Sequence, residues 1–229
     1  MKAGIKRITS AILMMALILT LAGTASADEE ADEREAERTA SYDITPDTNS
    51  IEGWPQGPQV YGSSAIVMDM KRGAVLYAKK PDEQHYPASI TKLMTALVAL
   101  ENAELDEEVY FSDDSISFLE FGDSQIGMRP GEILSLNDAL YGMLLASANE
   151  VSYAIAESVG TLMGGGFDTF IRKMNDRAAE IGCTGSHWVN ANGLHDDGHY
   201  TTAHDMAVIA SEVYQFEELR TVMQTLQYT

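Results

Sequence analysis

Residues 65–97 read AIVMDMKRGAVLYAKKPDEQHYPASITKLMTAL, and this stretch decides the fold class. Residues 64–70 and 74–79 are two short apolar runs on either side of Lys71-Arg72-Gly73, a pattern that predicts a β-hairpin. After residue 88 the apolar side chains recur at helical spacing. A helix is therefore predicted to begin at or just before Ser89.

The rest of the chain reads as mostly helical. Helices are predicted from the capping-box sequence at Ser135 and Asp138, over 151–159, after a Gly-rich turn over 167–181, and over 205–213 and 217–226. Only weak strand patterns follow the hairpin, at 108–111 and 133–136. Because a lone hairpin is marginally stable and has two open edges, either these strands complete its sheet or the chain stops early.

The composition narrows the function classes. Hydrophobic residues make up 45% of the 229 residues, which is enough for a packed core and excludes a wholly disordered chain. The 35 acidic and 15 basic residues give a formal net charge of −20, which argues against a general nucleic-acid binder. A single cysteine, Cys183, excludes a disulfide framework and Cys-rich metal sites.

The N-terminal segment has the pattern of an export signal. A basic start is followed by an apolar run over 11–22 and by Ala25-Ser26-Ala27, which predicts a signal peptide over 1–27 and an extracytoplasmic location. Residues 28–50 are acidic with almost no apolar side chains, which predicts a disordered linker. The folded domain is then expected over 51–229.

Two short motifs carry residue types suited to nucleophilic catalysis. In Ser89-Ile90-Thr91-Lys92, helical spacing places the Lys92 amine within reach of the Ser89 hydroxyl, and burial favours the neutral amine that could take the serine proton. Alone, S-x-x-K occurs by chance about as often as not in a chain of this length. In Ser147-Ala148-Asn149, a hydroxyl and an amide could both face a cleft, although the three residues taken alone favour a plain helix–helix connection.

The order and spacing of the two motifs, together with longer segments, point to one family. The stretch 65–97, GDSQIGMRPGE (122–132), LLASANEVSYAIAE (144–157) and NANGLHDDGHYTTAHDMAVIA (190–210) resemble the D-alanyl-D-alanine carboxypeptidases of the low-molecular-mass penicillin-binding type, peptidase family S11. The resemblance covers roughly residues 60–229. It implies an α+β penicillin-binding/serine β-lactamase-like transpeptidase fold, in which helices and a helical subdomain accompany an antiparallel sheet.

The resemblance also implies the roles of the site residues. Ser89 would be the acyl-enzyme nucleophile and its N–H half of an oxyanion hole, with Lys92 as general base. Ser147 would relay the proton, and Asn149 would help to position Lys92 and the substrate. The implied substrate is a peptidoglycan stem peptide ending in D-Ala-D-Ala, in cell-wall biogenesis, with β-lactams as acylating inhibitors and without a cofactor. The resemblance also implies membrane contact only through a C-terminal anchor, which we expect to be absent from these 229 residues.

One expected motif does not occur in the sequence. The family's K-T-G, on a strand beside the cleft, is not found, and Lys71-Arg72-Gly73 lies in the wrong place, ahead of Ser89. We therefore expect a C-terminally truncated catalytic domain without its last sheet strands and with little or no peptidase activity. A non-catalytic penicillin-fold remnant that binds wall peptides or a partner is the alternative, and a β-lactamase is a lesser one.

Three histidines invite a metal hypothesis, because His195, His199 and His204 lie close together in the sequence. They fall within the segment that resembles a non-metallic enzyme, among Asp and Gly residues typical of a loop. No metal ligands are therefore assigned.

Overall fold

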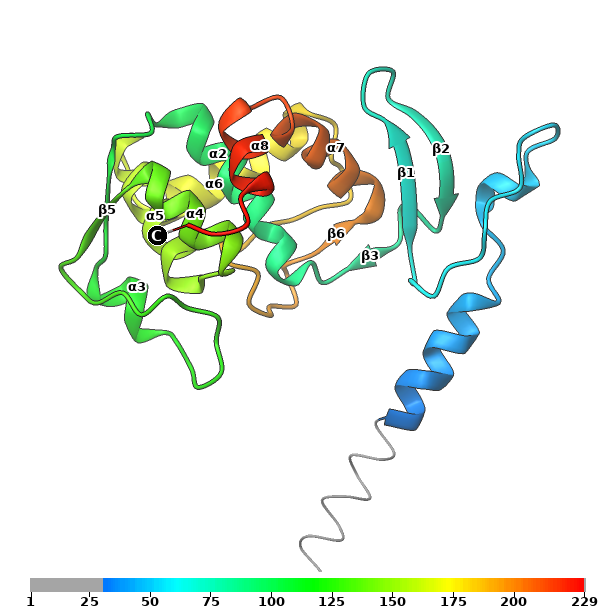
Figure 1. Cartoon of the computed structure of the whole chain (residues 1–229), viewed down its shortest axis with the longest axis horizontal. Coiled ribbons are helices and arrows are strands. Elements are labelled where there is room, and N and C mark those ends of the chain that lie inside the picture. Colours follow the sequence, from blue (N-terminus) through cyan, green and yellow to red (C-terminus); the bar gives the residue numbers. More distant parts are fainter. Residues whose placement is uncertain (1–30, 229) are drawn as a thin grey trace, which may run out of the picture. The chain divides into compact units, whose positions relative to one another are not determined.

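The computed structural model describes residues 31–228 and divides the chain into one unit up to Ser63 and a second from Ser64 (Figure 1). The signal peptide predicted over 1–27 lies outside the described residues. The second unit carries both sequence motifs.

In the first unit, residues 31–42 form a helix and η1 (Asp47–Ser50) is a single 3-10 turn. Over residues 31–50 this differs from the disorder predicted for 28–50. The physical reason is that Ala, Glu and Arg are strong helix formers. The helix also carries an i,i+3 ion pair of Glu35 with Arg38 at 3.5 Å, and the Arg38 guanidinium lies 5.0 Å from the ring centre of Tyr61.

The second unit begins with the predicted hairpin, which is confirmed. Strands β1 (Ala65–Asp69) and β2 (Ala74–Lys79) pair antiparallel. At their turn the backbone N–H groups of Lys71 and Arg72 donate to Asp69 Oδ1, and Gly73 takes a φ of +64°. Helix α7 (Ala203–Val213) packs against β1.

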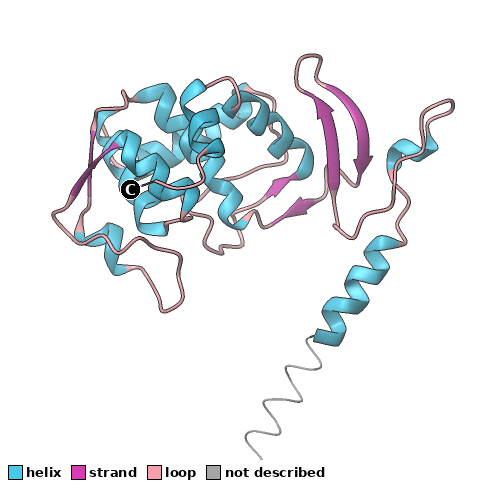
Figure 2. Ribbon diagram, viewed as in Figure 1, coloured by secondary structure: helices cyan, strands magenta, loops and turns pink. Residues whose placement is uncertain are grey.

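Each described strand has one partner, so residues 31–228 hold three two-stranded sheets (Figure 2). Strands β4 (Glu108–Tyr110) and β5 (Ile133–Ser135) form where weak strands were predicted, but they pair with each other. The option that they complete the hairpin's sheet is therefore wrong. Strands β3 (Gln84–His85) and β6 (Thr201–Thr202) pair as well, and two residues are too short to give a periodic signal in the sequence.

Helix α2 (Thr91–Asn102) is the centre of the second unit, since several helices pack against it. Its apolar residues from Met94 to Ala99 are fully buried, as expected for a helix covered on most sides. The helices that contact it are α4 (Leu136–Leu145), α5 (Asn149–Leu162), α6 (Phe167–Glu180) and α7. The remaining helices are α3 (Asp113–Ser117) and α8 (Glu217–Gln224).

The predicted helices after the hairpin are confirmed, including the cap at Ser135, whose hydroxyl accepts the Asp138 N–H at 3.1 Å. An ion-pair network joins three of the helices. Arg177 on α6 donates to Glu101 on α2 and to Glu212 on α7, each at 2.9 Å. Nowhere in residues 31–228 is a helix both long and apolar enough to cross a bilayer.

Candidate active site

Ser89 lies in a tight turn that leads into α2. Residues Ala88–Ile90 form the 3-10 turn η2, and Thr91 begins the helix. Ala88 takes a φ of +48°, a left-handed conformation that costs a non-glycine residue about 1 to 2 kcal/mol. The turn leaves Ser89 exposed, so its hydroxyl is accessible from solvent.

Lys92 lies one helical turn after Ser89, with its amine held by two other segments. Its Nζ lies 2.8 Å from Asn149 Oδ1, 2.8 Å from the Asn192 carbonyl oxygen and 3.4 Å from Ser89 Oγ. Two positions on the amine nitrogen are taken by hydrogen bonds to these two oxygens, which leaves a third position facing the serine. The predicted proximity of Ser89 and Lys92 is present in the structure.

The environment of Lys92 weakens its hold on a proton. The side chain is almost completely buried, and this burial lowers the pKa of Lys92 to about 8, against the opposing charges of Glu150 and Asp123. At neutral pH a fraction of the amine is therefore unprotonated. Such an amine can accept a proton from a hydroxyl 3.4 Å away.

The second motif forms the turn between α4 and α5. Ser147 has a φ of +56°, and Asn149 is the first residue of α5. The Asn149 N–H donates to the Ser124 carbonyl at 2.8 Å, so the loop between α3 and β5 fixes the turn. The Ser147 hydroxyl is buried and has no hydrogen-bond partner among the described residues.

The two motifs meet at a cleft of about 280 Å³. Ser89, Lys92 and Ser147 line it, and Asn149, which is not in the lining, accepts a hydrogen bond from Lys92. The remaining lining is apolar and comes from η2, α2 and α4: Ile90, Leu93, Met143 and Leu144. The structure thus brings all the predicted site residues together, from segments 57 residues apart in the case of Lys92 and Asn149.

Sequence reasoning missed residues in the segment NANGL (190–194), which the family resemblance had marked only as a whole. The Asn192 carbonyl accepts from Lys92, and the Ala191 carbonyl accepts from Thr95 Oγ1 at 2.7 Å. Gly193 approaches Ala88 so closely that a Cβ there would lie 1.8 Å from the Ala88 carbonyl oxygen. No spacing rule reveals these contacts, because most of them use backbone atoms.

Lys71-Arg72-Gly73 and the three histidines do not line this cleft. The tripeptide occupies the β1–β2 turn. His195 is exposed beside Asp197, His204 lies in the first turn of α7, and His199 is buried. Within residues 31–228, no group of three or more His, Cys, Asp or Glu side chains could hold a metal ion.

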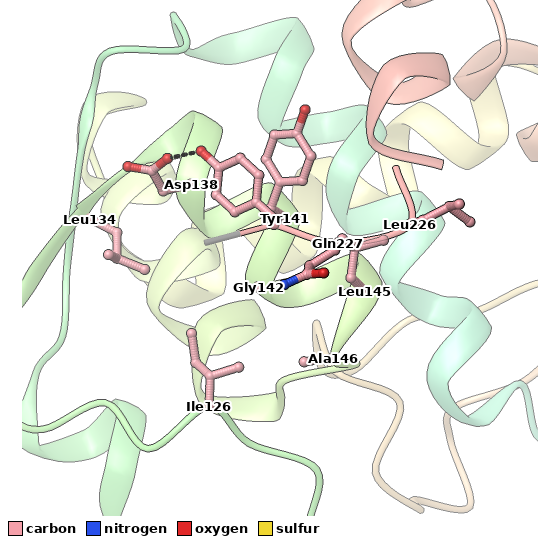
Figure 3. Close-up of a pocket in the computed structure, with 10 residues that line it drawn as sticks. Ile126, Leu134, Asp138, Tyr141, Gly142, Leu145, Ala146, Leu226 and Gln227 are labelled. Atoms are coloured by element: carbon pink, nitrogen blue, oxygen red, sulfur yellow. Dashed lines mark hydrogen bonds between the residues drawn. The ribbon is translucent and has the colours of Figure 1, made fainter. Parts of the chain in front are cut away.

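A larger pocket of about 590 Å³ involves α4 but contains none of the predicted site residues (Figure 3). The C-terminal residues Leu226 to Tyr228 close one side of it. The Tyr228 ring stacks on Tyr141 with centroids 3.7 Å apart, and its hydroxyl donates to the Asp138 carboxylate. The pocket has no nucleophile–base pair, so the reactive groups gather in the smaller cleft.

Comparison with known proteins agrees with this geometry. The family model described as D-alanyl-D-alanine carboxypeptidase matches residues 52–228. D-alanyl-D-alanine carboxypeptidase DacF of Bacillus subtilis is 35% identical over 161 residues, which cover 68% of this chain and 40% of DacF. DacB2 of Mycobacterium tuberculosis is 33% identical over 68% of this chain and 50% of its own length. The chain thus spans about 40 to 50% of the length of these two relatives.

Solved structures show the same relationship and confirm the predicted fold class. The D-alanyl-D-alanine carboxypeptidase DacD of Francisella tularensis superposes with a TM-score of 0.62 at 33% identity, over 69% of this chain and 38% of that one. Penicillin binding protein 6B of Escherichia coli gives a TM-score of 0.71 at 25% identity, over 79% and 58%. The chain belongs to the D-alanyl-D-alanine carboxypeptidase family, peptidase S11.

Proposed function

We propose that these residues belong to the site of a serine acyl transferase acting on peptidoglycan stem peptides ending in D-Ala-D-Ala, with the following reaction in the whole enzyme. Ser89 Oγ attacks the carbonyl carbon of the penultimate D-Ala while Lys92 takes the hydroxyl proton. Collapse of the tetrahedral intermediate breaks the peptide C–N bond, and a proton relayed through Ser147 leaves with the free D-Ala. Water then hydrolyses the acyl-enzyme and restores the Ser89 hydroxyl.

The observation that carries this proposal is the setting of the Lys92 amine. It is buried, held at 2.8 Å by both Asn149 and Asn192, and directed at Ser89 Oγ 3.4 Å away. A buried lysine with a pKa of about 8 suits a general base, whereas an ordinary helix-surface lysine would remain charged. The names of the relatives supply the substrate class.

Further parts of the proposal rest on the sequence. Residues 1–27 would be an export signal, the chain would act outside the cytoplasm, and β-lactams would acylate Ser89. The 229 residues contain no K-T-G, whose lysine binds the substrate carboxylate in the family. We therefore propose that Ser89 can be acylated by a reactive β-lactam, whereas turnover of a peptide substrate by this chain is slow or undetectable.

The test combines two assays on the purified chain. Incubation with benzylpenicillin should add the mass of one intact penicillin, and peptide mapping should place it on Ser89. The control variant Ser89→Ala should show no adduct. In parallel, release of D-Ala from a stem pentapeptide should stay near background; rapid Ser89-dependent release would show that the peptidase reaction does not need K-T-G.

Two alternatives remain as readings of the same chain. The first is a non-catalytic penicillin fold that binds wall peptides or a partner. In that case neither the wild-type chain nor Ser89→Ala would form an adduct, but both would still bind peptidoglycan. A β-lactamase would be revealed by an adduct that disappears within minutes as the penicillin is hydrolysed.

A further inference from the structure

The buried imidazole of His199 is bonded at both ring nitrogens. The backbone N–H of Val189 lies 3.1 Å from Nδ1, and Thr91 Oγ1 lies 2.8 Å from Nε2. A backbone N–H can only donate, so Nδ1 must carry the lone pair. In the neutral ring the proton is then on Nε2, which donates to the Thr91 hydroxyl.

The Thr91 hydroxyl passes this direction on to the nucleophile turn. Because it accepts from His199, its own hydrogen is free to donate to the Ala88 carbonyl, which lies 2.8 Å from Thr91 Oγ1. The backbone of Gly193 also lies against this carbonyl, where any Cβ would be 1.8 Å from the oxygen. Ala88 is the residue with the left-handed backbone directly before Ser89.

We propose that His199 is a positioning residue for acylation: as a neutral, Nε2-protonated imidazole it orients Thr91, which holds the Ala88 carbonyl and so fixes the turn that presents Ser89. This inference rests on the proposed function, because it assigns a role in the Ser89 reaction. It gives a task to the one of the three clustered histidines that is buried.

The surroundings of His199 keep the ring neutral. Burial lowers the pKa of His199 to about 4, with Asp196 acting in the opposite direction and His187 in the same one. Trp188 packs edge-on against the ring, with centroids 5.4 Å apart. An imidazolium would place a hydrogen on Nδ1, facing the N–H of Val189. The hydrogen bond from Val189 to His199 would then be lost.

The kinetic test measures acylation by benzylpenicillin as a maximal rate constant and an apparent dissociation constant. His199→Ala and Thr91→Val should each lower the rate constant by about ten- to a hundred-fold, because a displaced nucleophile reacts slowly, and should leave the dissociation constant nearly unchanged. Thr91→Ser and His199→Gln, which keep a hydroxyl and an N–H donor, should restore most of the rate. His204→Gln is the matched control and should behave as the wild type.

Two structural measurements test the inference independently of acylation. The ¹⁵N shifts of the His199 ring should show the Nε2-protonated tautomer at pH 7, and a crystal structure of Thr91→Val should show Ser89 displaced. A rate that falls only in proportion to the folded fraction would overturn the proposal, as would the other tautomer or an unmoved Ser89. If the wild type forms no adduct, the proposed function fails, and these two measurements alone decide whether His199 holds the turn.

Discussion

The two turns that flank the cleft use the same strained backbone but differ in how their polar atoms are bonded. Ala88 and Ser147 both have left-handed φ values, +48° and +56°. At Ala88, the carbonyl oxygen accepts a hydrogen bond from Thr91 and lies against the backbone of Gly193. At Ser147, the buried hydroxyl has no partner within residues 31–228.

The site therefore has a preassembled half, formed by the Ala88 turn with Ser89 and Lys92, and a second half at Ser147 whose hydroxyl is free to form further hydrogen bonds. The nucleophile turn is fixed by protein contacts alone, which suits a group that must be held before the substrate arrives. An unbonded buried hydroxyl costs free energy, and residues that keep such a cost are commonly functional. It agrees with the proposed relay role, in which Ser147 bonds to the reacting groups.

The largest expected effect follows from closing the space beside the Ala88 carbonyl. Gly193→Ala would place a Cβ 1.8 Å from that oxygen, at a φ of +88°. We expect the free energy of unfolding to fall by about 2 to 4 kcal/mol and acylation by more than about a hundred-fold. Chemical denaturation and penicillin acylation measure the two effects.

Gly164→Ala is the matched control. Gly164 has a nearly equal φ of +86°, but its Cβ would meet nothing within 4 Å. Only the backbone cost of a left-handed alanine, about 1 to 2 kcal/mol, should appear, with acylation unchanged. Equal acylation by the two variants would show that the Ala88 turn does not depend on the close contact with the Gly193 backbone.

Ser147→Ala should separate catalysis from stability. Removing the unbonded hydroxyl should slow acylation by about 10² to 10⁴-fold while stability stays the same or rises by about 1 kcal/mol. Asn149→Leu, which takes an acceptor from buried Lys92, should instead destabilise the chain by about 1 to 3 kcal/mol. If Ser147→Ala were destabilised as much as Asn149→Leu, the Ser147 hydroxyl would have to be bonded in solution.

The contrast between the turns also shows what the sequence could and could not predict. Side-chain spacing identified Ser89 and Lys92, because helix periodicity places residues three apart on one face, whereas the S-x-N motif was identified only by its order after S-x-x-K and by the family resemblance. The contacts of the segment 190–194 were not predictable. The Asn192 carbonyl accepts from Lys92 and the Gly193 backbone lies against Ala88, and such backbone contacts leave no residue pattern.

The fold was predictable to a similar degree. Long periodic helices and the hairpin were identified, since their patterns repeat over several turns or residues. Strands of two or three residues were not assigned to partners, because pairing is decided by tertiary contacts: β4 pairs with β5, and β3 with β6. The helix at 31–42 was missed because its acidic composition resembles that of disordered segments.

A smaller change in the acylation rate is expected from pH. It arises because Lys92, the proposed base, belongs to the preassembled half. With the pKa of Lys92 at about 8, the neutral amine and the acylation rate should both increase about tenfold between pH 7 and pH 9. The folded pKa lies below the unfolded value of about 10.4, so the unfolded chain binds more protons between these values. The contribution of Lys92 to the free energy of unfolding therefore rises with pH in that window. A flat acylation profile from pH 6 to 9 would contradict a lysine base.

The smallest expected effect comes from Glu150, which follows Asn149 and links the two halves electrostatically. Its carboxylate is fully buried: Oε1 accepts the Ile126 N–H at 2.7 Å, and Oε2 has no partner within the described residues. Burial lowers the pKa of Lys92, and the charge of Glu150 partly opposes this. Glu150→Gln keeps an oxygen for Ile126 but removes the charge, so the rise in acylation should move to lower pH.

Glu157→Gln, the same substitution two turns later on α5, is the control. Glu157 accepts from Ser112 at 2.6 Å and is not among the charges that act on Lys92, so the pH profile should stay in place. If Glu150→Gln also left the profile in place, the pKa of Lys92 would be set by burial and by Asp123, without a contribution from Glu150. The S-x-N turn would then influence the base only through the hydrogen bond from Lys92 to Asn149, and Asn149→Leu alone would shift the profile.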